Sequence, residues 1–187
     1  LYFINRLDHV ILEKRSRKYL WYNAIPFVVF FLAFVIWTFL SDGFAVNPVS
    51  GEVYMSPHKY FLNLVEMPVV LITFLLGVCG VLYGIIRTLL SEKFRKGIWF
   101  AGTGTVLTVL SLLLLAGFND TALYPSATHL QSSLTLSNAS SSEFTLKVMS
   151  IVSLIIPFVV LYIFYAWRAL EKKRTNVEEI NEEPHAY

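Results

Sequence analysis

Charged residues are scarce in this chain, and the few that occur are clustered between long apolar runs. Asp, Glu, Lys and Arg make up 15% of the 187 residues, hydrophobic residues make up 56%, and the mean hydropathy is +0.59. An ordinary soluble domain carries about 25% charged residues. The composition therefore excludes such a domain and predicts a membrane protein. The net charge of only +2 gives no reason to expect a nucleic-acid partner.

Cysteine is almost absent as well. The single residue, Cys79, excludes an intramolecular disulfide and a thiolate-based metal site. Motifs for nucleotide binding, hydrolytic nucleophiles and metal clusters are missing. The four histidines lie outside the long apolar runs, at His9, His58, His129 and His185. A membrane haem needs an axial His, Met or Cys at depth, so we expect this chain to hold no haem by itself.

Four apolar runs are long enough to cross a bilayer core, which takes about 20 helical residues. The predicted spans are 20–40, 64–90, 97–118 and 146–169. They follow a cytoplasmic connector at 1–19 and precede an acidic cytoplasmic tail at 170–187. The predicted fold class is all-α, a polytopic membrane protein with four transmembrane helices in one bundle. The apolar spacing of the connector fits either an interfacial amphipathic helix or a plain linker.

Positive charge alternates from one connection to the next. All but two of the 15 Lys and Arg residues precede the first span, lie at or between the adjoining ends of the second and third, or lie at or beyond the end of the fourth. The exceptions are Lys59 and Lys147. By the positive-inside rule, both termini face the cytoplasm. Tryptophan supports the same boundaries, since each one lies near a predicted interface: Trp21, Trp37, Trp99 and Trp167.

Small residues and span-end acids are the other features of the spans. Gly80-x-x-x-Gly84 in the second span and Gly102-Thr-Gly104 in the third predict close helix packing. The spans contain no His and no Asp, so no chain of buried acids is expected to carry protons through the bilayer centre. Three ionisable groups lie near the external span ends, and we predict that they belong to a polar network: Glu66, Asp120 and Tyr124.

The hydroxyl-rich loop before the fourth span is the most individual stretch of the chain. It contains Tyr124-Pro-Ser126, Ser133-Leu-Thr-Leu136 and Asn138-Ala-Ser-Ser-Ser-Glu-Phe-Thr-Leu-Lys-Val-Met149. This loop, continued through the final span to Trp167-Arg168, resembles the last external loop of subunit II of cytochrome bd-type quinol oxidases. The first span and the Ser-Asp42-Gly43 after it look like that family's sixth transmembrane helix and the following loop.

The resemblance covers the whole chain, as about the C-terminal half of that subunit. One departure is Phe118-Asn119-Asp120, where family members often have Phe-Pro. The resemblance implies a bacterial terminal oxidase that oxidises quinol, reduces dioxygen to water and builds a proton gradient. It places haems b and d in subunit I, the expected partner, and this chain in the inner membrane as a multi-pass protein. The family also allows a small single-span accessory subunit as a partner.

The resemblance assigns no catalytic, cofactor-binding or metal residue to this chain. Two other functional classes are compatible with four spans. Half of a small membrane transporter would need ionisable groups or broken helices at the membrane midplane, and none is visible in the sequence. A structural membrane assembly subunit unrelated to respiration has no such requirement. The oxidase subunit is the favoured interpretation because the loop motif is more specific than the spans.

Overall fold

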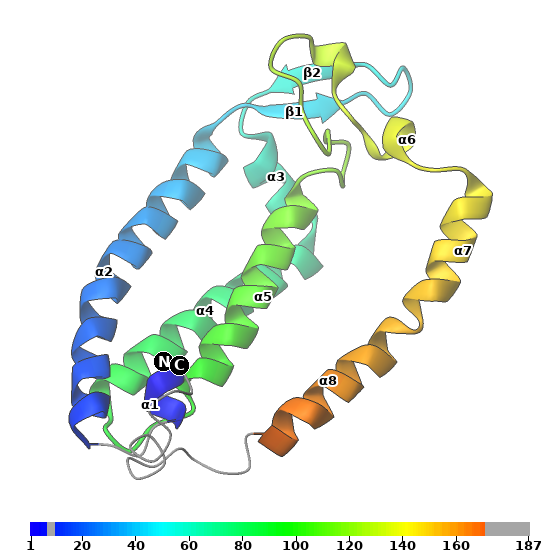
Figure 1. Ribbon diagram of the computed structural model, residues 1–187. Coiled ribbons are helices and arrows are strands. Elements are labelled where there is room, and N and C mark those ends of the chain that lie inside the picture. The colour runs from blue at the N-terminus through cyan, green and yellow to red at the C-terminus, as the bar shows by residue number, and fades with distance from the viewer. Residues whose placement is uncertain (7–9, 171–187) are drawn as a thin grey trace.

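The structure, a computed structural model, describes residues 1–6 and 10–170. Long helices extend from a small cap that contains a two-stranded sheet (Figure 1). Four helices are long and apolar enough to cross a membrane: Val10–Leu40, Pro68–Leu90, Gly97–Leu115 and Glu143–Ala169. The predicted all-α polytopic fold with four spans is confirmed.

The elements follow one another along the chain in a simple order. Helix α1 (Tyr2–Arg6) precedes the long helix α2 (Val10–Leu40). The cap begins with strands β1 (Gly43–Val46) and β2 (Val53–Ser56) and helix α3 (Lys59–Glu66). Helices α4 (Pro68–Leu90) and α5 (Gly97–Leu115) form a hairpin. The cap then resumes with the 3₁₀ turn η1 (Leu130–Ser132) and α6 (Leu136–Ala139), before α7 (Glu143–Ser153) and α8 (Ile156–Leu170).

Helix α2 begins ten residues before the predicted first span. Its 31 residues give it a length of about 46 Å, more than the ~30 Å thickness of a bilayer core. Residues 10–18, expected to form a separate interfacial helix or a linker, continue the span helix instead, because they contain neither glycine nor proline to end it. The predicted connector pattern starts in 7–9, which lies outside the described residues. The predicted acidic tail is 170–187; Leu170 ends α8, and 171–187 lies outside the described residues.

The second predicted span, 64–90, is divided in the structure. Proline disfavours the helical conformation in the residue before it, and Met67, which precedes Pro68, has φ −108° and ψ 80°. Helix α3 therefore ends at Glu66 and belongs to the cap. Helix α4 alone forms the second span.

The fourth span is interrupted too, between Ser153 and Ile156. Because Pro157 has no N–H to donate, it cannot continue the α-helical hydrogen-bond pattern. The N–H groups of Leu154 and Ile155 instead bond three residues back, at 3.1 and 3.0 Å. None of the described side chains of α7 and α8 is buried, and the two helices lie apart from α4 and α5 (Figure 1). We expected all four spans to pack as one bundle. Within the described chain, α2, α4 and α5 pack together, and the fourth span, formed by α7 and α8, lies beside them.

Small residues allow α4 and α5 to pack with their backbones in close contact. A Cβ atom built on Gly104 would lie 2.6 Å from the carbonyl oxygen of Gly77, and one on Gly84 would lie 2.7 Å from that of Gly97. The predicted close packing is confirmed for Gly80, Gly84 and Gly104, whereas Gly102 faces away from the seam, since a Cβ atom there would have no atom within 4 Å. The buried hydroxyl of Thr108 donates to its own helix, to the carbonyl of Gly104 at 2.8 Å, so it needs no partner across the seam.

An apolar cluster joins these helices to α2 and to the cap. Its buried members are Leu64, Val70, Phe74 and Leu115, and Phe31 and Phe39 of α2 pack against them. Phe39 makes an edge-on contact with Phe74, with ring centroids 6.2 Å apart. The core of the described chain therefore lies where α2, α3, α4 and α5 meet, beneath the cap.

The cap is held together by main-chain hydrogen bonds. Strands β1 and β2 pair antiparallel, and the other edge of β1 bonds to the segment after α5, with Val46 N–H donating to the Asp120 carbonyl at 2.8 Å. The side chain of Gln131 substitutes for a strand on the outer edge of β2, because it bonds both the N–H and the carbonyl of Val53, at 3.1 and 2.9 Å. The loop expected after the first span is therefore a hairpin joined to the later cap segment.

Candidate functional site

Asn63 is the centre of a polar network at the junction of the cap and the spans. It lies in the last turn of α3 and is fully buried. Its amide nitrogen donates to the carbonyl oxygens of Leu115 and Phe118, at 3.1 and 3.3 Å, and contacts the hydroxyl of Thr121 at 3.3 Å. The last carbonyls of a helix have no partner within it. Asn63 therefore caps the end of α5 from a different helix.

Asn119 extends this network to the surface. Its amide donates to the Asn63 side-chain oxygen at 3.0 Å and to a carboxylate oxygen of Glu66. Asn119 and Asp120 both have a left-handed backbone, with φ of 52° and 55°. Asparagine and aspartate tolerate this conformation best among residues with a side chain, whereas proline is fixed near −65°. Position 119 therefore accepts asparagine, whereas a proline there could not adopt the positive φ of this turn.

The three predicted network residues have different places in the structure. Glu66 belongs to the network through its bond with Asn119. Asp120 is exposed and joins the cap through its main-chain carbonyl. Tyr124 is 73% exposed, and its main chain pairs with Leu134. The structure therefore brings Glu66 and the backbone of Asp120 to one junction and places the ring of Tyr124 outside it; whether any of them has a functional role stays a prediction.

Sequence reasoning missed the neutral members of this network, Asn63 and Thr121. Both are almost fully buried polar side chains, with exposed fractions of 0% and 2%. The sequence gives one indication of such a role: Asn63 directly precedes an apolar run, a position from which a polar side chain can bond the unpaired carbonyls of a helix end. Nothing in the sequence identifies the α5 end, more than 50 residues away, as its partner.

Tyr60 lies close to this junction, on α3. Burial raises the pKa of its hydroxyl above the ordinary value, and a backbone hydrogen bond with Phe44 of β1 acts in the opposite direction with a smaller effect. The neutral phenol is thus the form that fits the folded cap. This makes Tyr60 a sensitive reporter of the packing between α3 and the sheet.

A second cluster of polar residues lies at the opposite end of the helices. Glu13 of α2 accepts hydrogen bonds from Arg17 and Arg95, each at 2.8 Å. Arg17 also donates to the carbonyl of Thr88, to that of Ser91 at 3.0 Å, and to that of Glu92 at 2.7 Å. Arg17 therefore caps the end of α4 as Asn63 caps the end of α5, and the cation complements the negative end of the helix dipole.

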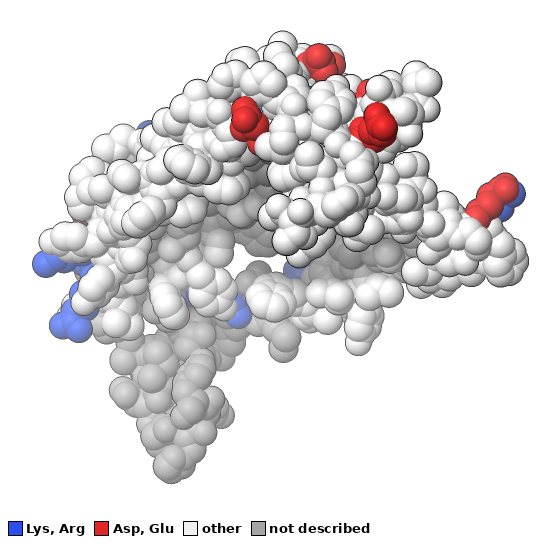
Figure 2. Space-filling view, turned by 90° about the horizontal axis from the view of Figure 1, so that it is seen from above, with Lys and Arg blue, Asp and Glu red and all other residues white. Residues whose placement is uncertain are grey.

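The charges separate along the helix axis. We call the end that carries α1, the start of α2, the 91–96 turn and the end of α8 the cationic end. The face seen from above, which the cap forms, displays acidic side chains (Figure 2). The described residues at the cationic end instead include Lys14, Arg15, Arg87 and Arg168. This separation is the pattern expected for a protein with its cationic end in the cytoplasm, and the orientation stays a prediction.

Possible metal ligands are dispersed. Within residues 1–6 and 10–170, no three His, Cys, Asp or Glu side chains come together as a metal site. His58 faces the Phe39 carbonyl at 3.2 Å and His129 lies beside Ser132, both in the cap. Cys79 is exposed on α4. His58 and His129 therefore lie at the ends of the spans, whereas Cys79 lies near the middle of α4 (Pro68–Leu90) without a His, Cys, Asp or Glu cluster around it among the described residues.

Comparisons with known proteins agree on one family. Residues 1–170 match the family model described as cytochrome bd terminal oxidase subunit II. The chain is 27% identical over 191 residues to the cytochrome bd-I ubiquinol oxidase subunit 2 of Escherichia coli (strain K12), covering 94% of this chain and 48% of that protein. It is also 27% identical over 165 residues to the probable cytochrome oxidase subunit 2 of Haemophilus influenzae, covering 82% of this chain and 42% of that protein. The chain thus spans about half the length of the curated relatives it matches.

Proposed function

The chain belongs to the family of cytochrome bd terminal oxidase subunit II, and we propose that it serves as the non-haem subunit of a quinol-oxidising terminal oxidase. The observation that carries this proposal is the family match, because it extends over all described helices and the cap. The four apolar helices support a multi-pass membrane location, and we propose that the membrane is the bacterial inner membrane.

We propose that haems b and d are held by subunit I, the partner of this chain. The distribution of donors supports this division of labour: His58 and His129 lie in the cap, and Cys79 is the single thiol of the sequence. A haem, where bound, supplies electron transfer and dioxygen chemistry through its iron. We propose a structural contribution for the residues described here, supported by the dispersal of their His and Cys side chains.

That contribution is to hold one helical hairpin rigidly at both ends. Asn63 closes the α5 end and Arg17 closes the α4 end, each from a different part of the chain. The glycine seam between α4 and α5 leaves little freedom for either helix to shift. A rigid hairpin of this kind supports a partner subunit that oxidises quinol, reduces dioxygen to water and contributes to a proton gradient.

The test is deletion of the full-length gene, followed by reduced-minus-oxidised spectra of the membranes and measurement of quinol-dependent oxygen consumption. We expect loss of the d-type haem band and of the quinol oxidase activity, with both restored by the intact gene. Membranes with an unchanged spectrum and unchanged oxygen consumption would overturn the proposal.

The predicted role of the span-end acids needs a separate test. In the full complex, Glu66→Gln and Asp120→Asn remove one charge each, and Glu52→Gln removes one from an exposed position in the same cap. We expect Glu66→Gln to lower the amount of assembled oxidase, since the neutral amide oxygen accepts a weaker hydrogen bond from Asn119 than the carboxylate does. Equal assembly and oxygen consumption in Glu66→Gln, Glu52→Gln and the wild type would exclude a role for Glu66.

A further inference from the structure

An apolar groove runs between the start of α5 and the last turns of α8, with α1 at one side. Its volume is about 380 Å³, and its walls include Tyr2, Ile98, Trp99, Val160, Phe164 and Trp167. Trp99 and Trp167 are each 54% exposed. Among residues 1–6 and 10–170, no charged side chain lines the groove, and Asn5 is the one amide there. The groove is therefore a site for an apolar chain.

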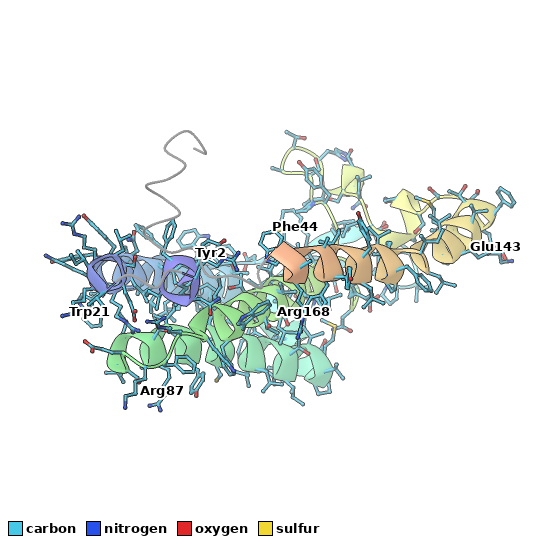
Figure 3. The ribbon with its side chains drawn as sticks, turned by 60° about the horizontal axis from the view of Figure 1, so that its bottom comes forward. Tyr2, Trp21, Phe44, Arg87, Glu143 and Arg168 are labelled. Atoms are coloured by element: carbon cyan, nitrogen blue, oxygen red, sulfur yellow. The ribbon has the colours of Figure 1, made fainter. Side chains whose placement is uncertain are left out.

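The groove opens at the cationic end of the molecule. On α8, Val160, Phe164 and Trp167 form one stripe, because residues three and four apart share a face. Arg168 follows Phe164 by four residues and continues that stripe by one turn. On the facing helix, Lys96 directly precedes the first turn of α5. Figure 3 shows Arg168 at the end of α8 and Tyr2 on α1, both at the end turned toward the viewer.

We propose that this groove binds an anionic phospholipid, with an acyl chain between α5 and α8 and the phosphate at Lys96 and Arg168. Basic residues beside a gap between membrane helices favour anionic headgroups. Tryptophan prefers the level of the headgroups, with its ring apolar and its N–H wet. The two tryptophans thus mark the depth at which an acyl chain meets its headgroup.

The dimensions of the groove favour a lipid over another helix. A helix with side chains is about 10 Å across and rises about 5.4 Å per turn. The groove volume of about 380 Å³ is therefore no larger than that of roughly one helical turn. An extended acyl chain is narrower than a helix and needs less volume for each ångström of its length. The cationic rim adds an attraction that a neutral transmembrane helix would not satisfy.

The test is phosphatidylglycerol binding to the purified, full-length membrane complex in detergent, read by native mass spectrometry. The test variant is Lys96→Gln with Arg168→Gln. The matched control, Arg87→Gln with Lys93→Gln, removes two exposed charges from the cationic end. Lys96 and Arg168 lie within two residues of one that lines the groove, whereas Arg87 and Lys93 are at least five residues from any such residue. We expect about thirtyfold weaker binding in the test variant, since each basic side chain near an anionic surface contributes roughly a factor of five. Equal losses in the two variants, or no loss in the test variant, overturn the proposal.

A second pair of variants examines the apolar part of the site without changing charge. Val160→Trp fills the groove, and Val159→Trp adds the same bulk to the neighbouring position, which does not line it. We expect Val160→Trp alone to reduce the number of bound phosphatidylglycerol molecules. Loss of subunit assembly in Val160→Trp with lipid binding unchanged would show that a protein segment occupies the groove, and it would overturn the proposal. This readout is lipid binding, so it does not depend on the proposed oxidase activity.

Discussion

Glu13 and Arg95 join two parts of the chain that are 82 residues apart. The Glu13 Oε2 atom accepts a hydrogen bond from the Arg95 Nη2 atom at 2.8 Å, while Oε1 accepts one from Arg17. The Glu13 side chain is only 12% exposed. One carboxylate therefore attaches α2 to the turn between α4 and α5, at the same end where Arg17 caps α4.

Replacing Glu13 should loosen this attachment. Glu13→Gln keeps the size of the side chain but leaves two guanidinium groups beside a neutral amide. We expect the free energy of unfolding to fall by about 1–3 kcal/mol, since a largely buried charge loses its counterion. The measurement is the thermal unfolding midpoint of the purified protein in detergent.

The matched control for Glu13 is Glu143→Gln, which breaks the pair with Lys147 on α7. Those side chains are 82% and 73% exposed, and exposed pairs at this spacing contribute only about 0.3–0.5 kcal/mol. The midpoint should therefore barely move. If Glu143→Gln lowered the midpoint as much as Glu13→Gln does, burial would not explain the importance of Glu13.

The seam between α4 and α5 predicts opposite effects for two glycines in one helix. A Cβ atom on Gly104 would lie 2.6 Å from the Gly77 carbonyl oxygen, whereas one on Gly102 would have no atom within 4 Å. Gly104→Ala should destabilise the protein by about 1–3 kcal/mol, because the helices must separate. Gly102→Ala should be neutral or stabilising by up to ~1 kcal/mol, because alanine favours a helix. Equal midpoints for the two variants would contradict the close packing.

Features that depend on the order of residues along one segment were accessible from the sequence. The four spans could be predicted because a long apolar run in lipid must satisfy its backbone hydrogen bonds internally, as a helix does. The glycine faces followed from helical spacing. The breaks before Pro68 and Pro157 follow from proline chemistry, although a single hydropathy run hides them.

Features that depend on distant partners were not accessible in the same way. Asn63 caps a helix end 52 residues further along the chain, and Arg17 caps one more than 70 residues away. The β1–β2 hairpin has strands of only four residues, and its register is fixed by Gln131 and the segment after α5. Glu66 could be proposed as a network member because it is charged at a span end, but its neutral partners carry no comparable signal.

Asn63 provides the third prediction. Asn63→Leu keeps most of the volume but removes the donor to the Leu115 and Phe118 carbonyls and the acceptor for Asn119. We expect a loss of about 1–3 kcal/mol in the free energy of unfolding, because buried polar groups lose partners. Hydrogen exchange should also become faster in residues 116–122.

The comparison for Asn63 is Asn47→Ala in the β1–β2 turn. There the Asn47 side chain accepts hydrogen bonds from the N–H groups of Val49 and Ser50, at 2.9 and 3.2 Å, in an exposed position where water can replace it. The cost should be below about 1 kcal/mol, with no effect on exchange at 116–122. Protection of 116–122 that survives in Asn63→Leu would mean that Thr121 holds the α5 end alone.

Tyr60 predicts how the cap responds to alkaline pH. Its pKa is raised in the folded state by burial, whereas an unfolded tyrosine loses its proton near pH 10. Above that pH the unfolded chain releases a proton that the folded cap retains, so the free energy of unfolding decreases as pH rises. Below about pH 10 both states keep the proton, and the contribution of Tyr60 is fully present. The free energy of unfolding of Tyr60→Phe should therefore change with pH as that of the wild type does up to that pH, and should decrease less above it.

Urea unfolding of both proteins from pH 8 to 11, followed by protein fluorescence, measures the slope of the free energy of unfolding against pH for each. Identical slopes above pH 10 would show that the half-buried Tyr60 phenol does not control the alkaline stability of the cap.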